Sequence, residues 1–361
     1  MRWPVSLAYR RFSSSYYRRQ SGAALILALV VVTVVVLLAS TLKSDFFVTF
    51  KRVENQLHSQ QADAYMRGAE GIAREVLSAD FNDDKASIGK DHRSEGFNQR
   101  IEYPISGGVI SGTLCDLQGR FNVNNLAAPA EGSEQYTADQ QLFIRLLQIL
   151  DLETPIDQSQ AEALTLAVAD WIDADGDVRG LGGAEDTYYS GLDLPYKAGN
   201  WPLQSVSELR WVKGVTADLY VALLPHITAL PAGVPLNINS ASHYLLRAIN
   251  DKGVLQPLSR SDAEGVLNDR DGDTDTDLFN QNEGFDEIAD FVRSHPSASL
   301  DTTSLSIGSD YFLQQTETLL LERFYTLFSV LHRGSGGSIK TIARSRGGIA
   351  GCPVEKTEIN G

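Results

Sequence analysis

The hydrophobic positions change their pattern along the chain, and the first stretch is the most apolar. Ala23 to Leu42 is a run of 20 residues without a charge, AALILALVVVTVVVLLASTL. As an α-helix such a run rises ~30 Å, about the thickness of the hydrocarbon core of a bilayer. From Ser44 to Leu77 apolar residues recur mostly every three or four positions, with charged residues between them, which is typical of an amphipathic helix. The two stretches predict one long helix, half in lipid and half amphipathic.

The segment before the apolar run is basic, with five arginines and no acidic residue in residues 1–22. Positive charge on that side predicts a cytoplasmic amino terminus and an external body. A cleaved secretory signal would have a shorter apolar core, of about 7–15 residues, so a plain signal anchor and a type IV prepilin-like leader remain open. The polar leader ends at Gly22 and the apolar run starts at Ala23, the arrangement in which a prepilin is cut between these two residues.

Most pilins carry a glutamate at the fifth position after that cut, and this chain has Leu27 there. A glutamate in a membrane helix is costly unless it finds a partner, and pilins are thought to pair it with the next subunit. A subunit with leucine loses nothing if no neighbour lies above it. Leu27 therefore favours a terminal position in a fibre.

Two blocks of strand-like sequence lie far apart, at Arg100–Val123 and at Tyr311–Arg344, the latter with a Gly/Ser turn at Gly334–Ser338. Between them, from about Gln135 to Pro296, the spacing is helical, as in QQLFIRLLQILDL. A sheet built from both ends of a chain implies an inserted domain. The predicted domains are a leader (1–22), a transmembrane helix (23–43), its amphipathic continuation (44–78), a sheet (79–126 and 303–347), a helical insert (127–302) and a tail (348–361).

Composition narrows the class of protein. The 361 residues are 43% hydrophobic and 21% charged, with a formal net charge of −15. The content of 27 Phe plus Tyr, 30 Gly and 2 Cys excludes disordered, collagen-like and disulfide-dense proteins, and the acidic balance argues against a nucleic-acid partner. Removing the five arginines of the leader changes the charge of the rest to −20, so the acidity belongs to the external body.

An acidic loop follows the predicted helix that ends at Trp171 and Ile172. Asp173, Asp175 and Asp177 alternate on a turning backbone, and Glu185 and Asp186 follow after several glycines. Because carboxylates at this spacing can converge on one cation, and Ca²⁺ takes oxygen ligands at flexible angles, the set suits calcium. The EF-hand template fails, and a solvated acidic loop is the alternative. A second alternating run, with Asp271, Asp273 and Asp275, is a further candidate that charge repulsion would otherwise keep extended.

The two cysteines, Cys115 and Cys352, allow one disulfide in an oxidising compartment, or else one buried and one free thiol. Catalytic motifs such as GxSxG, HExxH, the P-loop and GxGxxG are absent, and the six histidines are scattered. Residues 235–249 look like the start of a helix-hairpin-helix module but lack its phosphate-gripping turn, which favours a shared scaffold over DNA binding.

Taken together, the sequence resembles the minor pseudopilin K family of type II secretion systems. The matching segments are the leader ending in Gly22, Leu27, DLQGRFNVNNL at 116–126, ADWIDADGD and GAEDTYY at 169–189, PYKAGNWPLQSVSELRWVKG at 195–214 and PLNINSAS at 235–242. The resemblance implies an α+β, type IV pilin-like fold, with a long amino-terminal helix, partly transmembrane, packed on an antiparallel sheet, and a large all-α inserted domain.

The resemblance also implies the role of the chain. Proteins of this family cap the tip of a periplasmic pseudopilus with minor pseudopilins I and J and prime its assembly, and their insert binds calcium. Prepilin peptidase, the other pseudopilus subunits and an inner-membrane assembly platform are the further partners implied, without nucleic acid and without enzymatic activity. A membrane-anchored periplasmic metal-dependent hydrolase and a DNA-uptake pseudopilin are the alternatives. Carried over, Asp173, Asp175, Asp177, Glu185 and Asp186 become the calcium-loop ligands.

Overall fold

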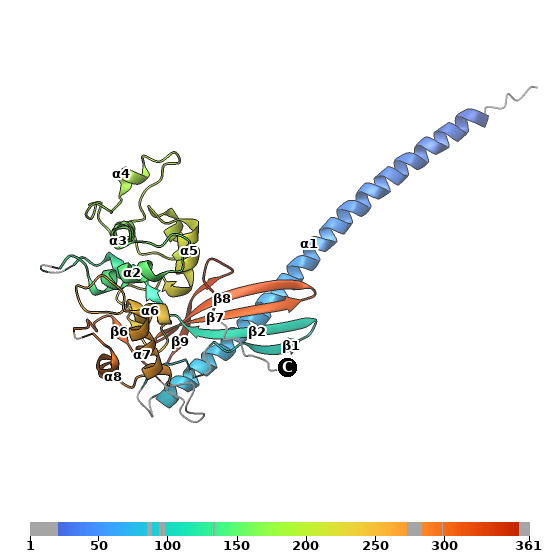
Figure 1. The fold of residues 1–361 in the computed structure, drawn as a ribbon. Coiled ribbons are helices and arrows are strands. Elements are labelled where there is room, and N and C mark those ends of the chain that lie inside the picture. Colours follow the sequence, from blue (N-terminus) through green and yellow to red (C-terminus); the bar gives the residue numbers. More distant parts are fainter. Residues whose placement is uncertain are drawn as a thin grey trace, which may run out of the picture. The chain divides into compact units, whose positions relative to one another are not determined.

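The structure is a computed structural model that describes residues 21–84, 89–93, 95, 98–130, 132, 134–272, 284–297 and 299–353. The chain divides into two compact units, one up to Gln60 and one from Gln61 onward. The first unit is helical over its described residues. The second holds the rest of the same helix, a sheet and a helical domain, and the fold class is α+β as predicted (Figure 1).

The amino-terminal helix, α1, runs from Ser21 to Asp84 without a break. Among the described residues it is the one helix long and apolar enough to cross a membrane, with a window of mean hydropathy 3.0 that is wholly exposed. The predicted end near residue 78 was wrong, because the apolar face continues past Leu77 to Phe81. The guanidinium of Arg333 lies over the Phe81 ring, 5.8 Å from its centroid, so this last turn packs against the sheet.

Five antiparallel strands form the main sheet, in the order β1-β2-β7-β8-β9. The central pair, β2 with β7, joins the two halves of the chain in register from Gly108↔Leu320 to Asp116↔Phe312. This pairing explains how one sheet encloses an insert. The strands are β1 (Ile101–Ile105), β2 (Gly108–Asp116), β7 (Tyr311–Leu320), β8 (Arg323–Arg333) and β9 (Ile339–Ser345).

The carboxy-terminal part of α1 lies along one face of this sheet (Figure 1). Two small apolar clusters make the contact, and each combines residues from the helix with residues from β7 and β8. Burying such side chains on both surfaces supplies about 1.5–3 kcal/mol for each large residue. The clusters contain Ala62, Met66, Leu320 and Leu327 in one case, and Ala73, Leu77, Phe312 and Leu331 in the other.

The insert occupies the chain between β2 and β7, and its helices gather beyond one end of the strands (Figure 1). Its helical elements are η1 (Val123–Ala127), α2 (Ala138–Ile149), α3 (Gln158–Ile172), α4 (Asp186–Tyr189), η2 (Val206–Trp211), α5 (Ala217–Leu223), η3 (Leu224–His226), α6 (His243–Ala248), α7 (Arg260–Asp271) and α8 (Ile288–Ser294). Two short parallel ladders accompany them, β3 (Phe121–Asn122) with β4 (Ile227–Thr228) and β5 (Leu236–Asn237) with β6 (Leu305–Ser306).

These ladders move the boundaries of the insert outward from the predicted 127 and 302. Phe121, Val123 and Leu126 are buried in the core of the helical domain and do not belong to the main sheet. Likewise Leu305 pairs with Leu236 inside the insert. These segments were predicted to belong to the sheet because their apolar residues are typical of strands, but their packing partners lie in the insert.

Candidate metal centre

The acidic loop starts where helix α3 stops. Asp157 and Gln160 form a capping box at the start of α3, and Asp173 is the residue that caps its other end. The N–H of Asp173 still donates to Ala169 O at 3.0 Å, although its own backbone is already extended. Because residues three apart lie on one side of a helix, this geometry places the side chains of Asp170 and Asp173 together at the end of α3.

Glu185 meets these two aspartates from the other end of the loop, immediately before α4. One carboxylate oxygen from each of Asp170, Asp173 and Glu185 lies within 4.8 Å of the others. All three side chains are buried, and their exposed fractions are 0%, 7% and 2%. The loop therefore gathers three acids from two helix ends into one site that is closed to solvent.

Asp170 shapes the loop from within. Its Oδ2 accepts the backbone N–H of Ala184 at 2.8 Å, and the N–H of Arg179 lies 3.2 Å from Oδ2 and 3.3 Å from Oδ1. The approach is so close that a Cβ on Gly183 would lie 2.2 Å from Asp170 Oδ2. Position 183 therefore requires glycine, and the backbone on both sides of the turn is held by one carboxylate.

The other two acids lack enough donors. Both carboxylate oxygens of Glu185 and Oδ1 of Asp173 are buried without a hydrogen-bond partner, while Arg179 Nη2 lies 2.8 Å from Asp173 Oδ2. Burial, followed by repulsion from Asp170, Asp173 and Asp175, raises the pKa of Glu185 to about 7. Because buried carboxylates need a counter-charge, and this donor set is oxygen only, a hard cation such as Ca²⁺ fits the site.

The structure therefore brings together only part of the predicted set. Asp173 and Glu185 lie in the buried cluster, whereas Asp175 and Asp177 are exposed and Asp175 Oδ1 accepts the N–H of Asp177. Asp186 faces outward, where Lys197 Nζ lies 3.0 Å from Oδ2 and Ala198 N–H donates to Oδ1. Asp170 was not predicted as a site residue, although its position three residues before Asp173 on a helix was a usable signal.

Comparison with known proteins decides the family. The model of the family "Type II secretion system (T2SS), protein K" matches residues 119–232, which include the whole acidic loop. A "Type II secretion system protein K" from Pseudomonas aeruginosa is 33% identical over 311 residues, covering 84% of this chain and 85% of the relative. This chain belongs to the type II secretion system protein K family.

Further relatives of the K family agree. The protein K from Pectobacterium carotovorum subsp. carotovorum is 30% identical over 311 residues. The match covers 83% of this chain and 88% of the relative. A chain in the crystal structure of the GspK-GspI-GspJ complex from the enterotoxigenic Escherichia coli type 2 secretion system superposes with a TM-score of 0.68 at 27% identity. That match covers 82% of this chain and 99% of the solved one, so the similarity includes sheet and insert.

In the second acidic run, the described residue Asp271 forms an ion pair and does not join a cluster of acids. Asp271 binds Arg270, with Oδ1 2.6 Å from Nε and Oδ2 2.8 Å from Nη2. Arg270 is fully buried and donates also to the carbonyls of Ile238 and Ala241. Asp271 is thus the charge partner of an arginine that anchors α7, and Asp273 and Asp275 lie outside the described residues.

A second group of three acids, which the sequence did not predict, lies near the end of α1. Asp80, Asp91 and Glu95 each place an oxygen within 4.8 Å of the others. Here an arginine already supplies positive charge, since Arg333 Nη1 lies 2.9 Å from Asp80 and Nη2 binds Asp91. Arg333 thereby ties the end of α1 and the following segment to β8. The group is an ion-pair junction. The acidic loop at 173–185 also contains an arginine, since Arg179 contacts Asp173 and Asp170, but both oxygens of Glu185 there lack a hydrogen-bond partner.

The two cysteines are joined in a disulfide, Cys115 to Cys352. It fixes the tail after β9 against β2, and the N–H of Cys352 donates to Gln315 Oε1 at 2.9 Å. Two carbonyls of this tail accept hydrogen bonds from the guanidinium of Arg120, Ala350 O at 3.0 Å and Gly351 O at 2.6 Å. Burial lowers the pKa of Arg120 to about 10, and these two tail carbonyls accept hydrogen bonds from the buried guanidinium.

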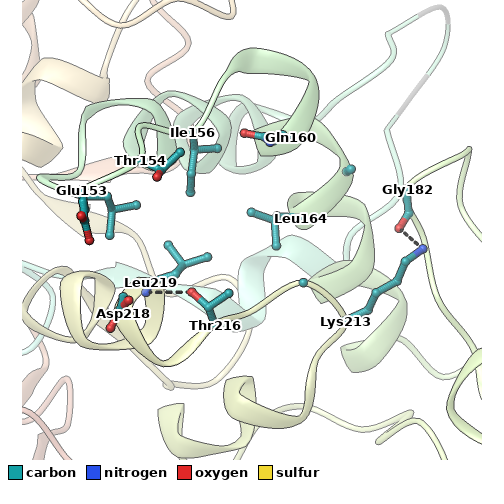
Figure 2. Close-up of a pocket in the computed structure, with 13 residues that line it drawn as sticks. Glu153, Thr154, Ile156, Gln160, Leu164, Gly182, Lys213, Thr216, Asp218 and Leu219 are labelled. Carbon is teal, nitrogen blue, oxygen red and sulfur yellow. Dashed lines mark hydrogen bonds between the residues drawn. The ribbon is translucent and has the colours of Figure 1, made fainter. Parts of the chain in front are cut away.

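A pocket of about 520 Å³ lies beside the acidic loop (Figure 2). Ile156 points into it from the segment before α3, Leu164 from α3 and Leu219 from α5. At its far side Lys213 reaches the loop and donates to the carbonyls of Gly182 and Gly183, each at 3.1 Å. Lys213 therefore holds the outer side of the turn that Asp170 holds from inside.

Proposed function

We propose that this chain is the K-type minor pseudopilin that caps the tip of a periplasmic pseudopilus together with minor pseudopilins I and J. In that position it primes fibre assembly for the export of folded proteins across the outer membrane. The observation that carries the proposal is the match over both sheet and insert to a chain solved in a GspK-GspI-GspJ complex. Membership of the K family supports it independently.

The proposed location is the bacterial inner membrane, with a single span, a cytoplasmic amino terminus and a periplasmic body. The exposed apolar part of α1 supports one span, and five arginines before it support the orientation. The Cys115–Cys352 disulfide suits an oxidising compartment. In the proposed pathway prepilin peptidase cuts between Gly22 and Ala23, after which the assembly platform takes up the mature helix.

Two features support the tip in preference to the shaft. The insert adds a whole helical domain between β2 and β7, which is too bulky to fit between stacked subunits. Leu27 stands where a shaft subunit would carry the glutamate that binds its neighbour. Both features are tolerated at a position with no subunit above it.

Calcium is proposed as the resident ion of the acidic loop, held by Asp173 and Glu185, with Asp170 organising the backbone around them. When bound, the ion supplies positive charge to a buried acidic cluster. The closed, oxygen-only surroundings favour a structural ion over a catalytic one, because a catalytic metal keeps an open position. A non-enzymatic role is therefore proposed, in preference to the metal-dependent hydrolase.

Deletion of the gene in its own bacterium tests the function. Proteins that the type II system normally exports should accumulate folded in the periplasm, and expression of the intact chain should restore their export. Mass spectrometry of the membrane-extracted chain should show a mature amino terminus at Ala23. Normal export in the deletion strain, or an intact leader, would contradict the proposal, and the hydrolase alternative would gain from an intact leader.

A further inference from the structure

The pocket on the insert beside the acidic loop has the size of a ligand site. Its volume is about 520 Å³, and ligand sites in proteins commonly measure about 300–1,000 Å³. Its walls come from the segment before α3, from one face of α3, from the start of α5 and from Lys213 with Gly214. The pocket is therefore formed by the tertiary packing of several segments.

Two glycines bring the walls close together at one end of the pocket. A Cβ on Gly182 would lie 2.3 Å from Ala163 Cα on α3, and a Cβ on Gly214 would lie 2.9 Å from Leu164 Cδ2. Gly214 also has a φ of +82°, which side chains rarely adopt. Because the backbone is packed this closely against α3, the shape of the pocket at this end is fixed before any ligand binds.

The floor of the pocket is apolar. Ile156, Leu164 and Leu219 point into it from three different segments (Figure 2). The first turn of α5 is held by a cap, in which the N–H of Leu219 donates to Thr216 Oγ1 at 3.2 Å. An apolar side chain that enters the pocket would lose its contact with water against this floor, which favours binding.

The charges around this floor are distributed unevenly. Glu153 and Asp218 lie at one end of the pocket, and Lys213 lies at the other (Figure 2). The ammonium of Lys213 is engaged by the carbonyls of Gly182 and Gly183. Glu153 and Asp218 are exposed, and neither forms an ion pair with any residue that the structure describes. The pocket therefore carries two uncompensated negative charges at one end.

We propose that this pocket binds a protein segment in which an apolar side chain stands next to a lysine or arginine. The apolar side chain occupies the floor, and the cation pairs with Glu153 and Asp218. Two carboxylates without a counter-charge attract such a partner and repel an acidic one, so the sign of the charge selects the segment. The proposal goes beyond the tip function and depends neither on the ion of the acidic loop nor on minor pseudopilins I and J.

Fluorescence anisotropy with labelled peptides tests the pocket in the full chain, reconstituted in phosphatidylcholine nanodiscs. Three short peptides of glycine and serine carry a leucine–lysine, a leucine–glutamate or an alanine–lysine pair at their centre, and empty nanodiscs are the blank. The wild-type chain should bind the leucine–lysine peptide roughly 10-fold more tightly than either of the others, because each of those lacks one of the two contacts.

Variants at exposed positions assign the binding to this pocket. Glu153→Gln combined with Asp218→Asn removes both charges and should weaken binding of the leucine–lysine peptide roughly 10-fold. The matched control, Asp193→Asn combined with Glu264→Gln, removes two exposed carboxylates outside the pocket and should bind like the wild type. Thr154→Trp fills the pocket and should abolish binding. Because all five side chains are exposed, every variant should melt close to the wild type.

Four results would overturn the proposal. Equal affinity for the lysine and glutamate peptides would show that the two carboxylates do not select the partner. An equal loss in the control pair would assign the attraction to the overall negative charge. Unchanged binding by Thr154→Trp would place the peptide elsewhere, and a wild-type chain that binds none of the peptides at millimolar concentration would have no such site. The tip function is tested separately, by complex formation with I and J.

Discussion

Glu70 on α1 and Arg344 on β9 form a two-pronged ion pair between the long helix and the last strand of the sheet. Arg344 Nε donates to Oε2 and Nη2 donates to Oε1, each at 2.8 Å. The carboxylate also accepts the hydroxyls of Thr341 at 2.6 Å and Ser329 at 3.1 Å. Glu70 is almost completely buried, at 1% exposure, so the helix is fixed to the sheet by a charge that cannot be solvated otherwise.

This ion pair predicts an acid-sensitive fold. Burial by itself would raise the pKa of Glu70, but hydrogen bonds from Arg344, Thr341 and Ser329 lower it from 4.5 to about 2. A carboxyl with a lowered folded-state pKa stabilises the protein above pH 4.5, and this contribution is lost as the pH falls toward 2. We expect Glu70→Gln to cost about 2 kcal/mol at pH 7, because the partner Arg344 is partly exposed.

Guanidinium unfolding of the two proteins between pH 7 and pH 3 measures this difference. The free energy of unfolding of the variant should approach that of the wild type as the pH falls. A gap that stays constant over the whole range would show that the charge of Glu70 is irrelevant.

The disulfide predicts a redox-dependent stability. Cys115 and Cys352 are 237 residues apart in the sequence, and removal of a native disulfide costs about 2–5 kcal/mol. Cys352→Ser should therefore melt at a lower temperature than the wild type. Part of the lost stability should come from Arg120, because release of the tail removes the carbonyls of Ala350 and Gly351 that accept its hydrogen bonds. Melting with and without dithiothreitol is the measurement. The reductant should lower the melting temperature of the wild type to that of the variant and leave the variant's melting temperature unchanged. A wild-type melting temperature that does not change would show that the disulfide does not stabilise the fold.

The metal centre predicts which acids of the loop matter. Asp173→Ala removes a buried carboxylate, whereas Asp177→Ala removes an exposed one outside the cluster. Calorimetric titration of Ca²⁺ should give roughly 100-fold weaker binding for the first variant, about 2.7 kcal/mol, and nearly unchanged binding for the second. Equal losses in both would show that the loop binds by its overall charge.

The close approach in the same loop predicts a steep steric effect. A Cβ on Gly183 would meet Asp170 Oδ2 at 2.2 Å, whereas a Cβ on Gly176 would meet nothing within 4 Å. We expect Gly183→Ala to lose about 2–4 kcal/mol of stability, since overpacking also breaks the bonds that Asp170 makes. Gly176→Ala, the control, should stay within about 0.5 kcal/mol of the wild type. Chemical unfolding of both, in EDTA, decides the point.

Much of the architecture could be predicted from the sequence because its patterns are local. The 20 uncharged residues at Ala23–Leu42 predict one membrane-spanning helix. The two strand blocks predicted one sheet built from both ends of the chain, and β2 and β7 pair in that sheet. The edges of the insert could not be predicted, because the place where Phe121 is buried depends on which domain supplies its neighbours. Apolar character alone does not distinguish the two.

The metal centre, too, could be predicted only where a local pattern encodes it. Asp173 and Glu185 were predicted from their spacing in an acidic, glycine-rich loop. Asp175 has the same spacing yet stays exposed, because the chain turns there and Asp175 Oδ1 caps the N–H of Asp177. The contact of Asn200 with the loop could not be predicted, although the residue lies in the segment PYKAGNWPLQSVSELRWVKG, because it is a tertiary contact that no local pattern encodes.

The most direct test of the account is whether this chain enters a complex with minor pseudopilins I and J. The full chain, carrying an affinity tag, is co-expressed with both partners, extracted in mild detergent and analysed by size exclusion with light scattering. The account predicts a ternary complex that contains one copy of each protein and survives gel filtration. Isolation of this chain alone, while I and J co-purify with each other, would contradict it.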